Sequence, residues 1–223
     1  GKTKAITYPE INSAEAMMEF NFISAIDKLM QKEKPVIGYA VGNGEPTSYN
    51  VEDLVQNTLQ EEYQFYSINP NTQSAIPKEF KVLFVVKPTD PFTDEAKLKL
   101  DQYVMNGGKV LFFIDKLNAE LDSLQSKKGQ VIAYDRELEL NDLLFKYGAR
   151  INADLVMDLQ CDFLPFDVNS NGQFELLPWN YFPVFESRSN HVINKNLGFV
   201  SGRFVNSIDT VEADGIKKTF LLG

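Results

Sequence analysis

The sequence is short of cysteine, histidine and tryptophan, with one of each in 223 residues. A single cysteine, Cys161, cannot form an intramolecular disulfide. That shortage fits a reducing compartment, and it also fits an extracytoplasmic domain whose core is large enough to need no cross-link. Zinc sites take their ligands mainly from cysteine and histidine. The composition therefore excludes a disulfide scaffold and argues against a zinc site.

Positive charge is also scarce, because 22 Lys and Arg are set against 31 Asp and Glu, which leaves a net charge of −9. The basic runs are no longer than pairs, such as Lys127-Lys128 and Lys217-Lys218. Nucleic acids and anionic lipid headgroups are bound by clustered Lys and Arg. We therefore expect no nucleic-acid partner and no direct adhesion to an anionic membrane surface.

Long hydrophobic runs are missing as well. No run approaches the roughly 18 apolar residues of a membrane span, and no signal-peptide pattern is present. Gly1 resembles a residue left by cloning, and the apolar run Thr219–Gly223 stops without a capping segment. We therefore expect the chain to be a fragment of a longer protein, with any membrane segments outside it.

Glycine-rich phosphate loops are not evident either. Gly107-Gly108-Lys109 is followed by Val110 and precedes a strand-like run, whereas a phosphate-binding loop needs Ser or Thr after the lysine and a helix. Gly42-Asn43-Gly44-Glu45 lacks the third glycine of the dinucleotide fingerprint and places a carboxylate near the pyrophosphate position. We therefore expect no NAD, FAD or other cofactor, and we interpret Gly107-Gly108 as a turn.

What the sequence does contain is the pattern of an α/β fold. Continuous apolar runs are typical of parallel strands covered on both faces, and here they alternate with segments of helical spacing. Parallel strands joined by helices form an open, mainly parallel sheet with helices on both faces. We expect strands at 36–41, 63–68, 82–86 and 110–114, and helices at 13–31, from Thr47 to Leu59, from Thr93 to Gly107, and from Asp135 to Gly148.

The character of the sequence changes near Cys161, after which aromatic residues, prolines and asparagines dominate. Ala153–Leu159 is expected to return to the sheet as a strand, and further strands are expected at 199–205 and 208–211. We therefore predict an α/β core with an N-terminal helix over 1–160 and a β-rich extension over 161–223, packed together as one compact unit.

The best candidates for function are Gly42, Asn43, Gly44, Glu45 and Asp115. They follow predicted parallel strands, and ligands of open α/β sheets bind at the carboxyl ends of the strands. Helix capping and loop hydrogen bonding are the structural alternative for Glu45 and Asp115, and the sequence leaves both roles open. We therefore predict a binding site on this loop and name no catalytic residue.

Two other groups of residues are weaker candidates for a catalytic or metal site. Cys161 and His191 could form a nucleophile and base, but no glycine flanks Cys161 as a nucleophile elbow requires. A buried structural thiol and a surface histidine are the simpler interpretation. Asp154, Asp158 and Asp162 recur every four residues and leave a weak calcium or magnesium site open, although a solvated edge is the favoured interpretation. We predict no metal site.

The order of several short tracts resembles one known family. The tracts are Gly42–Pro46, Ile76-Pro77, Val82–Pro88, Phe92–Glu95, Gly107–Asp115, Leu140–Gly148, Asp154–Asp158 and Asn190–Ile193 followed by Leu197. In this order they are similar to the GldG-like proteins, the auxiliary components of ABC transporters linked to gliding motility. The main departure is Asn43, where many relatives carry histidine.

The resemblance implies a flavodoxin-like or class I amidotransferase-like fold without its catalytic nucleophile. It implies a domain on the periplasmic side of the bacterial inner membrane, held by membrane helices outside this fragment, with an ABC transporter permease and ATPase as partners. We therefore expect a non-enzymatic accessory or binding domain. An unrecognised amidotransferase-like or hydrolase-like enzyme, and a carbohydrate- or peptide-binding module using the aromatic residues after Cys161, are the alternatives.

Overall fold

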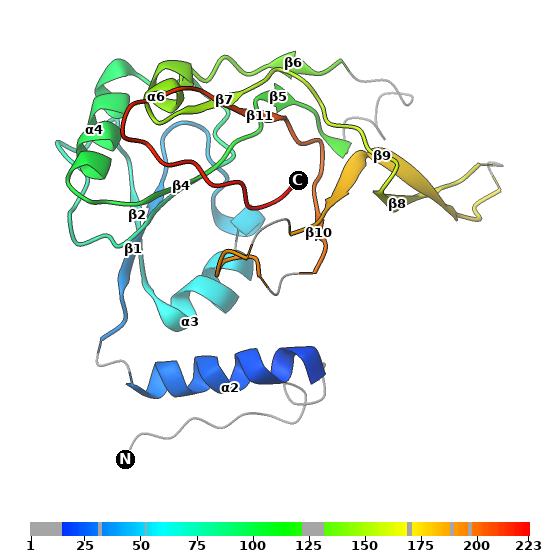
Figure 1. The fold of residues 1–223 in the computed structure, drawn as a ribbon, viewed down its shortest axis with the longest axis horizontal. Helices are drawn as coiled ribbons and strands as arrows, with labels where there is room; N and C mark the ends of the chain where they lie inside the picture. Colours follow the sequence, from blue (N-terminus) through cyan, green and yellow to red (C-terminus); the bar gives the residue numbers. More distant parts are fainter. Residues whose placement is uncertain are drawn as a thin grey trace.

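A four-stranded parallel sheet forms the centre of the fold, in the order β2-β1-β3-β4 (Figure 1). Its strands are β1 (Val36–Ala40), β2 (Gln64–Ile68), β3 (Leu83–Val86) and β4 (Val110–Phe113). The computed structural model describes residues 15–30, 33–51, 53–121, 132–168, 171–187, 190–195 and 198–223. A strand order that runs outward in both directions from β1 is typical of doubly wound folds. The predicted α/β class is confirmed.

Helices connect these strands. The N-terminal helix is α2 (Glu15–Met30), and the connection from β3 to β4 is α4 (Asp94–Met105). Thr93 caps α4 as predicted, because its Oγ1 accepts a hydrogen bond from the N–H of Ala96 at 3.2 Å. Gly107, with φ of +91°, ends the helical segment in the left-handed region. The expected turn at Gly107-Gly108 is therefore confirmed.

The connection from β1 to β2 is helical but irregular. It consists of η1 (Ser48–Val51), η2 (Asp53–Leu59) and α3 (Gln60–Glu62), which are 3₁₀, π and α segments respectively. The β-branched residues Val51 and Val55 lower helix propensity in this stretch. The segment between Thr47 and Leu59 is therefore helical, as predicted, but it does not form the single regular α-helix that we expected.

The helix before Gly148 begins later than predicted. It is α6 (Asn141–Lys146), whereas Asp135 lies in β6 (Tyr134–Asp135), which pairs with β5 (Leu117–Asn118). The start at Asp135 was wrong because Glu137 and Glu139 adopt φ of +50° and +56°, which an α-helix cannot contain. Asp135 instead accepts a hydrogen bond from the N–H of Glu137.

The expected strand at Ala153–Leu159 is also wrong. The chain there is a loop after β7 (Ala149–Ile151), and β7 pairs antiparallel with β11 (Ile208–Thr210). The Asp154 carboxylate accepts hydrogen bonds from the N–H and hydroxyl of Ser207 at 2.8 and 2.6 Å. Aspartates that bond backbone N–H groups in this way favour turns over strands.

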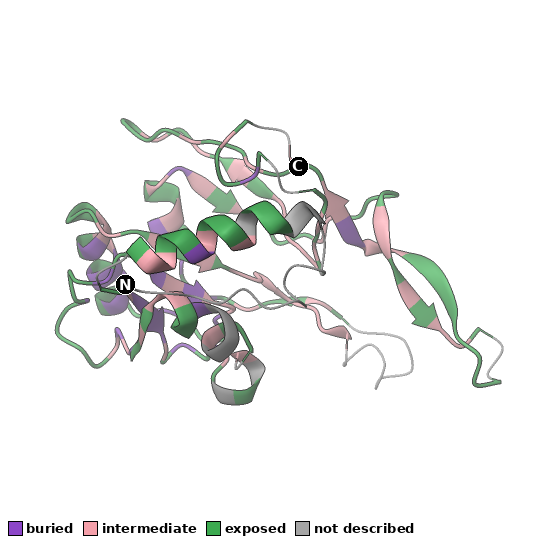
Figure 2. Cartoon of the chain, turned by 90° about the horizontal axis from the view of Figure 1, so that it is seen from below, coloured by how far each residue is buried: buried purple, intermediate pink, exposed green. Residues whose placement is uncertain are grey.

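The β-rich character of the C-terminal part is confirmed. β8 (Cys161–Phe166) and β9 (Glu175–Phe185) form a long hairpin, to which β10 (Val200–Ser201) adds a short third strand. The hairpin projects from the body (Figure 1), and Figure 2 shows that its tip is exposed. Because β11 returns to β7, one small sheet joins residues on both sides of position 160. The division into 1–160 and 161–223 stays a prediction.

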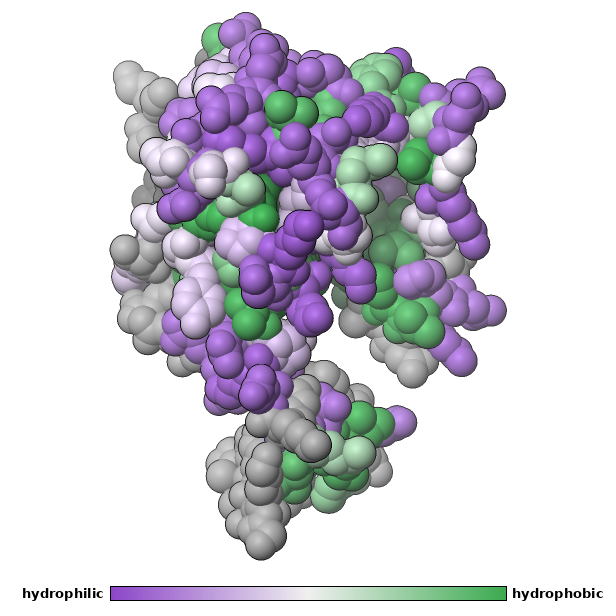
Figure 3. Space-filling view, turned by 90° about the vertical axis from the view of Figure 1, so that its left-hand side faces the viewer, coloured by the Kyte–Doolittle hydropathy of each residue, from purple (hydrophilic) through white to green (hydrophobic). Residues whose placement is uncertain are grey.

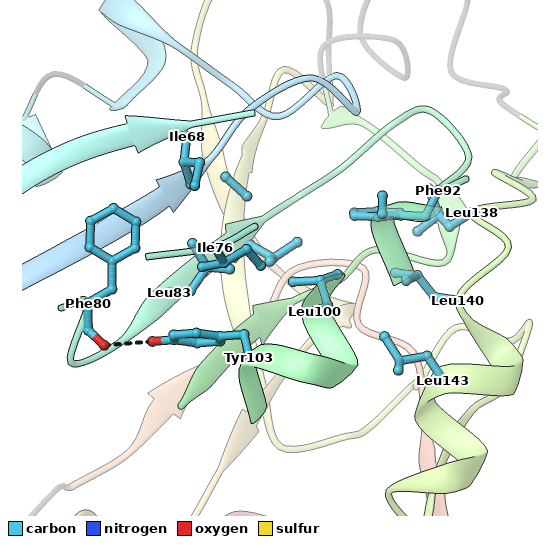
Figure 4. Close-up of a cluster of buried hydrophobic side chains, with 13 residues drawn as sticks. Ile68, Ile76, Phe80, Leu83, Phe92, Leu100, Tyr103, Leu138, Leu140 and Leu143 are labelled. Carbon is cyan, nitrogen blue, oxygen red and sulfur yellow. Dashed lines mark hydrogen bonds between the residues drawn. The ribbon is translucent and has the colours of Figure 1, made fainter. Parts of the chain in front are cut away.

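A cluster of 13 buried residues forms the main core, and α4 packs it against one face of the sheet (Figure 4). Leu83, Val85 and Leu100 are almost fully buried in it, and the Tyr103 hydroxyl donates to the carbonyl of Phe80 at 2.9 Å. Ile37 and Tyr39 alternate with Gly38 and are also buried, so both faces of β1 are covered.

The strand β4 differs from this pattern. We expected it to be buried on both faces, but Leu111 and Phe113 are 44% and 55% exposed. The strand lies at the edge of the sheet, and packing covers only the side that carries Val110 and Phe112. A continuous apolar run therefore predicted the strand correctly and its burial incorrectly.

Two leucines on α4 test this description of the core. Leu100→Ala should lower the free energy of unfolding by about 2–5 kcal/mol, because it leaves a cavity beneath the helix. Leu98→Ala is the matched control, since Leu98 is exposed, and should change stability by less than about 0.5 kcal/mol. Urea denaturation followed by far-UV circular dichroism measures both. Equal losses in the two variants would contradict the assigned face of α4.

Candidate functional site

Three loops meet at the carboxyl edge of the sheet. They follow β1, β2 and β3, and the predicted residues Gly42, Asn43, Gly44 and Glu45 lie in the first of them. The Asn43 carbonyl accepts hydrogen bonds from the N–H groups of Thr89 and Asp90 at 2.9 and 3.0 Å. The backbone therefore joins the loop after β1 to the loop after β3.

The Asn43 side chain extends the same connection. It is 2% exposed, and its Nδ2 donates to the carbonyl of Pro91 at 2.9 Å. Asn71, in the loop after β2, donates from Nδ2 to Asn43 Oδ1 and to the carbonyl of Gly42, both at 3.2 Å. The Thr93 hydroxyl donates to Asn71 Oδ1 at 3.3 Å. The three loops and the first turn of α4 thus form one hydrogen-bonded network.

Backbone conformation and close packing explain why glycine occupies positions 42 and 44 in the first loop. Gly42 and Gly44 adopt φ of +113° and +76°, which side chains other than glycine rarely tolerate. A Cβ on Gly44 would lie 1.9 Å from Thr89 Oγ1. These glycines therefore let two loops approach each other, which is a different role from exposing amides to a phosphate.

Glu45 is buried directly beneath this network. Its Oε2 accepts a hydrogen bond from the N–H of Asn43 at 2.7 Å, while its buried Oε1 has no hydrogen-bond partner among the described residues. Burial raises the pKa of Glu45 above its ordinary value of 4.5; the N–H groups of Asn43 and Glu45 itself lower it, and the charge of Asp90 adds a smaller increase. Its ionised form is therefore penalised.

Glu45 also affects the pKa of Tyr39. Burial, together with the negative charge of Glu45, raises the pKa of Tyr39 to about 12. The Tyr39 hydroxyl donates to the carbonyl of Pro46 at 2.7 Å, which fixes the end of the loop. Tyr39 therefore remains a neutral hydrogen-bond donor at physiological pH.

Asp115 belongs to a different group of charges. Its carboxylate lies 3.5 Å from Lys87 Nζ, and Glu120 lies 2.9 Å from the same ammonium. The structure thus places Asp115 at the carboxyl end of β4, as predicted, but in an ion-pair cluster with Lys87 rather than in the Asn43 network. Whether any of the five predicted residues binds a ligand stays a prediction.

The remaining candidates have local partners. Cys161 Sγ donates to Asn180 Oδ1 at 3.6 Å, and His191 Nδ1 accepts a hydrogen bond from the N–H of Ile193 at 3.3 Å. Asp162 accepts from the hydroxyl of Ser201. Within the described ranges, no three His, Cys, Asp or Glu side chains are arranged to hold a metal ion.

Sequence reasoning missed three residues of the network, namely Asn71, Thr89 and Asp90. Each lies in a loop directly after a predicted strand, as Asn43 does. That shared position, at the carboxyl ends of adjacent parallel strands, was the available signal. Nothing in the sequence indicated that these polar groups would bond to one another instead of facing a ligand.

Comparison with known proteins then identifies the family. A family model described as "ABC-type uncharacterized transport system" matches residues 34–223. The chain belongs to this family. The family is that of auxiliary components of ABC-type transport systems.

Two relatives add detail to the family assignment. An uncharacterized protein of Borreliella burgdorferi is 18% identical over 212 residues, which are 92% of this chain and 39% of that protein. The chain thus spans about two fifths of the relative's length. The solved mmIFT52 N-terminal domain is similar with a TM-score of 0.50 at 15% identity, over 79% of this chain and 69% of that one. At this identity the likeness shows the fold alone.

None of the helices in the described part of this family member has the length and hydrophobicity that a membrane span requires.

The buried carboxyl group predicts a specific pH dependence. The pKa of Glu45 is raised on folding, so its contribution to stability is fully present below 4.5 and is lost as the pH rises through the folded-state pKa. Glu45→Gln removes this titration. The stability of the variant relative to the parent should therefore increase between acid and neutral pH. Urea denaturation across this range measures the difference, and a pH-independent difference would contradict a raised pKa.

The network makes a second prediction, about Asn43. Asn43→Ala should lower the free energy of unfolding by about 1–3 kcal/mol, because it leaves the Pro91 carbonyl without its donor. The amides of Thr89 and Asp90 should also exchange faster with deuterated water. Asn106→Ala is the control, since Asn106 is exposed and bonds only within its own helix end. A similar change in both variants would show that the network does not hold the loops together.

Proposed function

We propose that this chain is a non-enzymatic, extracytoplasmic binding domain of its ABC transport system. The observation that carries the proposal is that the strand-end loops are hydrogen-bonded to one another. In enzymes with this type of sheet, polar groups at the carboxyl edge converge on a ligand. Here the side chain of Asn43 is buried and the polar groups of three loops bond to one another. The edge is therefore a preformed surface suited to contact with a protein partner.

The exposed residues around this edge give the surface its chemistry. Gly42, Gly44, Thr89 and Asp90 are exposed, while Asn43, whose carbonyl binds the amides of Thr89 and Asp90, is buried. Tyr49, at the start of the helical connection that follows, is 88% exposed. An exposed tyrosine beside a rigid loop is the kind of residue that anchors protein interfaces. We place the centre of the partner-binding surface here.

The hairpin β8–β9 supplies a second part of the working surface. Phe174 and Leu176 near its tip are 69% and 68% exposed, and Figure 2 shows this end standing clear of the body. Exposed apolar groups that gather on a projecting hairpin are typical of a protein contact. The rings of Phe166 and Trp179 contact each other across the hairpin in a tilted arrangement, with centroids 5.4 Å apart.

The finer assignment remains part of the same proposal. The order of the sequence tracts favours a GldG-like component of a gliding-motility transporter, on the periplasmic side of the bacterial inner membrane. The sheet order supports a flavodoxin-like or amidotransferase-like relationship. The partners would be the permease and the ATPase of the transporter, and membrane segments outside this chain would anchor it.

Affinity purification of the full-length protein from detergent-solubilised membranes tests this function. We expect an ATPase and a multi-span permease to be recovered in near-equal amounts by mass spectrometry. Tyr49→Ala should reduce their recovery by at least about tenfold if Tyr49 is an anchor. Tyr134→Ala is the control, because Tyr134 is also exposed but lies on β6. Recovery of the protein alone, in good yield, would overturn the proposal.

A further inference from the structure

An apolar cavity of about 520 Å³ lies on the covered side of β4. Its walls are α4, α6, β4 and the β7–β11 pair, represented by Val104, Leu144, Phe112, Ala149 and Ile208. Cavities of this size hold small molecules in many proteins. It is separate from the Asn43 network, which lies at the carboxyl edge of the sheet.

The cavity results from the way β4 ends the sheet. The carbonyls of Lys109 and Phe113 accept hydrogen bonds from the N–H groups of Leu83, in β3, and of Lys87, just after it, at 2.8 and 2.7 Å. Because successive residues of a strand face opposite sides, the N–H and C=O of Phe112 point away from β3. A right-handed crossover through α6 would place the next strand on that edge. Instead β7 pairs with β11, and in the described part of the chain no strand pairs with this side of β4.

Two polar side chains in the cavity wall, those of Asn206 and Tyr147, already have hydrogen-bond partners. Asn206 Oδ1 accepts from the N–H of Lys116 at 2.8 Å, and its Nδ2 donates to the Asp154 carbonyl at 2.5 Å. The Tyr147 hydroxyl donates to Asp101 at 2.8 Å. A cavity lined in this way offers few partners to water, so it suits a hydrocarbon chain.

A second pocket, of about 330 Å³, adjoins the first and shares Gly108 and Lys109 with it. Lys78 and Lys81 also line this second pocket. Among the described residues, no acidic group forms an ion pair with Lys78, Lys81 or Lys109, in contrast to Lys99 in the same pocket, which lies 2.7 Å from Glu95. Three uncompensated lysines lie together here, although the chain as a whole carries a charge of −9.

Lys78, Lys81 and Lys109 are exposed, which suits a polar entrance. Figure 3 views the molecule from the left-hand side of Figure 1, where the C-terminal end of α4 and the loop before β3 lie. Most of that face is hydrophilic (Figure 3). An anionic group at the lysines would therefore remain near water. A hydrocarbon chain attached to it would pass Lys109, which lines both pockets, and enter the apolar cavity.

We propose that the two adjoining pockets form one binding site for an anionic amphiphile. The hydrocarbon part occupies the apolar cavity, and the carboxylate or phosphate lies against Lys78, Lys81 and Lys109. This site does not depend on the proposed partner-binding role, because no residue of the Asn43 network lines either pocket. The amphiphile comes either from solution, as a free fatty acid, or from a bilayer, as an anionic lipid.

Titration calorimetry of the whole 223-residue chain with dodecanoate, below its micelle concentration, tests the site. We expect saturable binding of one dodecanoate. Val104→Phe fills the cavity and should weaken binding by about tenfold or more. Met105→Phe is the matched control on the same helix, since Met105 is exposed, and should bind as the parent does. Ala149→Leu blocks the opposite wall and serves as a second cavity variant should Val104→Phe unfold.

The charged half of the site has its own readout. Lys109→Gln should weaken dodecanoate binding by about twofold to fivefold, as expected for a partly exposed ion pair, and should leave dodecanol binding unchanged. Lys217→Gln removes an exposed lysine elsewhere and should affect neither ligand. Equal effects of Lys109→Gln on the two ligands would overturn the assigned role of Lys109.

Vesicles distinguish the two sources of the amphiphile. Cosedimentation with phosphatidylglycerol vesicles that is lost in Val104→Phe would support the site with a bilayer lipid as its ligand. Binding of dodecanoate without cosedimentation would support it with a free amphiphile. The proposal is overturned if dodecanoate and vesicles both fail to bind, or if the cavity variants bind as the parent does. Neither result bears on recovery of the transporter subunits.

Discussion

The Asn43 carbonyl is the acceptor on which the arrangement of this fold depends. Two amides from the loop after β3 bond to it, and the Asn43 side chain binds the same loop and Asn71. Asn71 in turn contacts Thr93, which caps α4. Because α4 covers the sheet and forms a wall of both pockets, this one buried asparagine links the carboxyl edge to the core.

The two edges of the sheet have opposite character. The carboxyl edge, where folds of this type usually bind ligands, is closed by its own hydrogen bonds and carries the buried carboxyl of Glu45. The amino edge has uncompensated lysines beside an apolar cavity. In a member of an ABC transport family, this division would let one edge contact protein subunits while the other receives an amphiphile.

The sequence predicted the central strands and α4 because their signals are local. Apolar runs and the cap at Thr93 depend on neighbours in the chain. The errors arise where backbone conformation or contacts between distant residues determine the structure. The positive φ of Glu137 excludes it from α6, and β7 pairs with the distant strand β11. For the site, the loop position of Asn43 was predictable, but its bonds to Asn71 and Pro91 were not. The lysine cluster was not predicted, because Lys109 is distant in the chain from Lys78 and Lys81 and only the fold brings the three to one pocket.

The unpaired edge of β4 has a consequence for the life of the chain before it is fully folded. Its residues, VLFFI at 110–114, combine high β-propensity with no charge, a composition that promotes cross-β association. Lys109 precedes this segment and Asp115 follows it. Charges at both ends oppose the parallel, in-register stacking of identical strands, because like charges then lie above one another, as with gatekeeper residues. These two side chains would therefore disfavour that form of association wherever the edge of β4 is accessible.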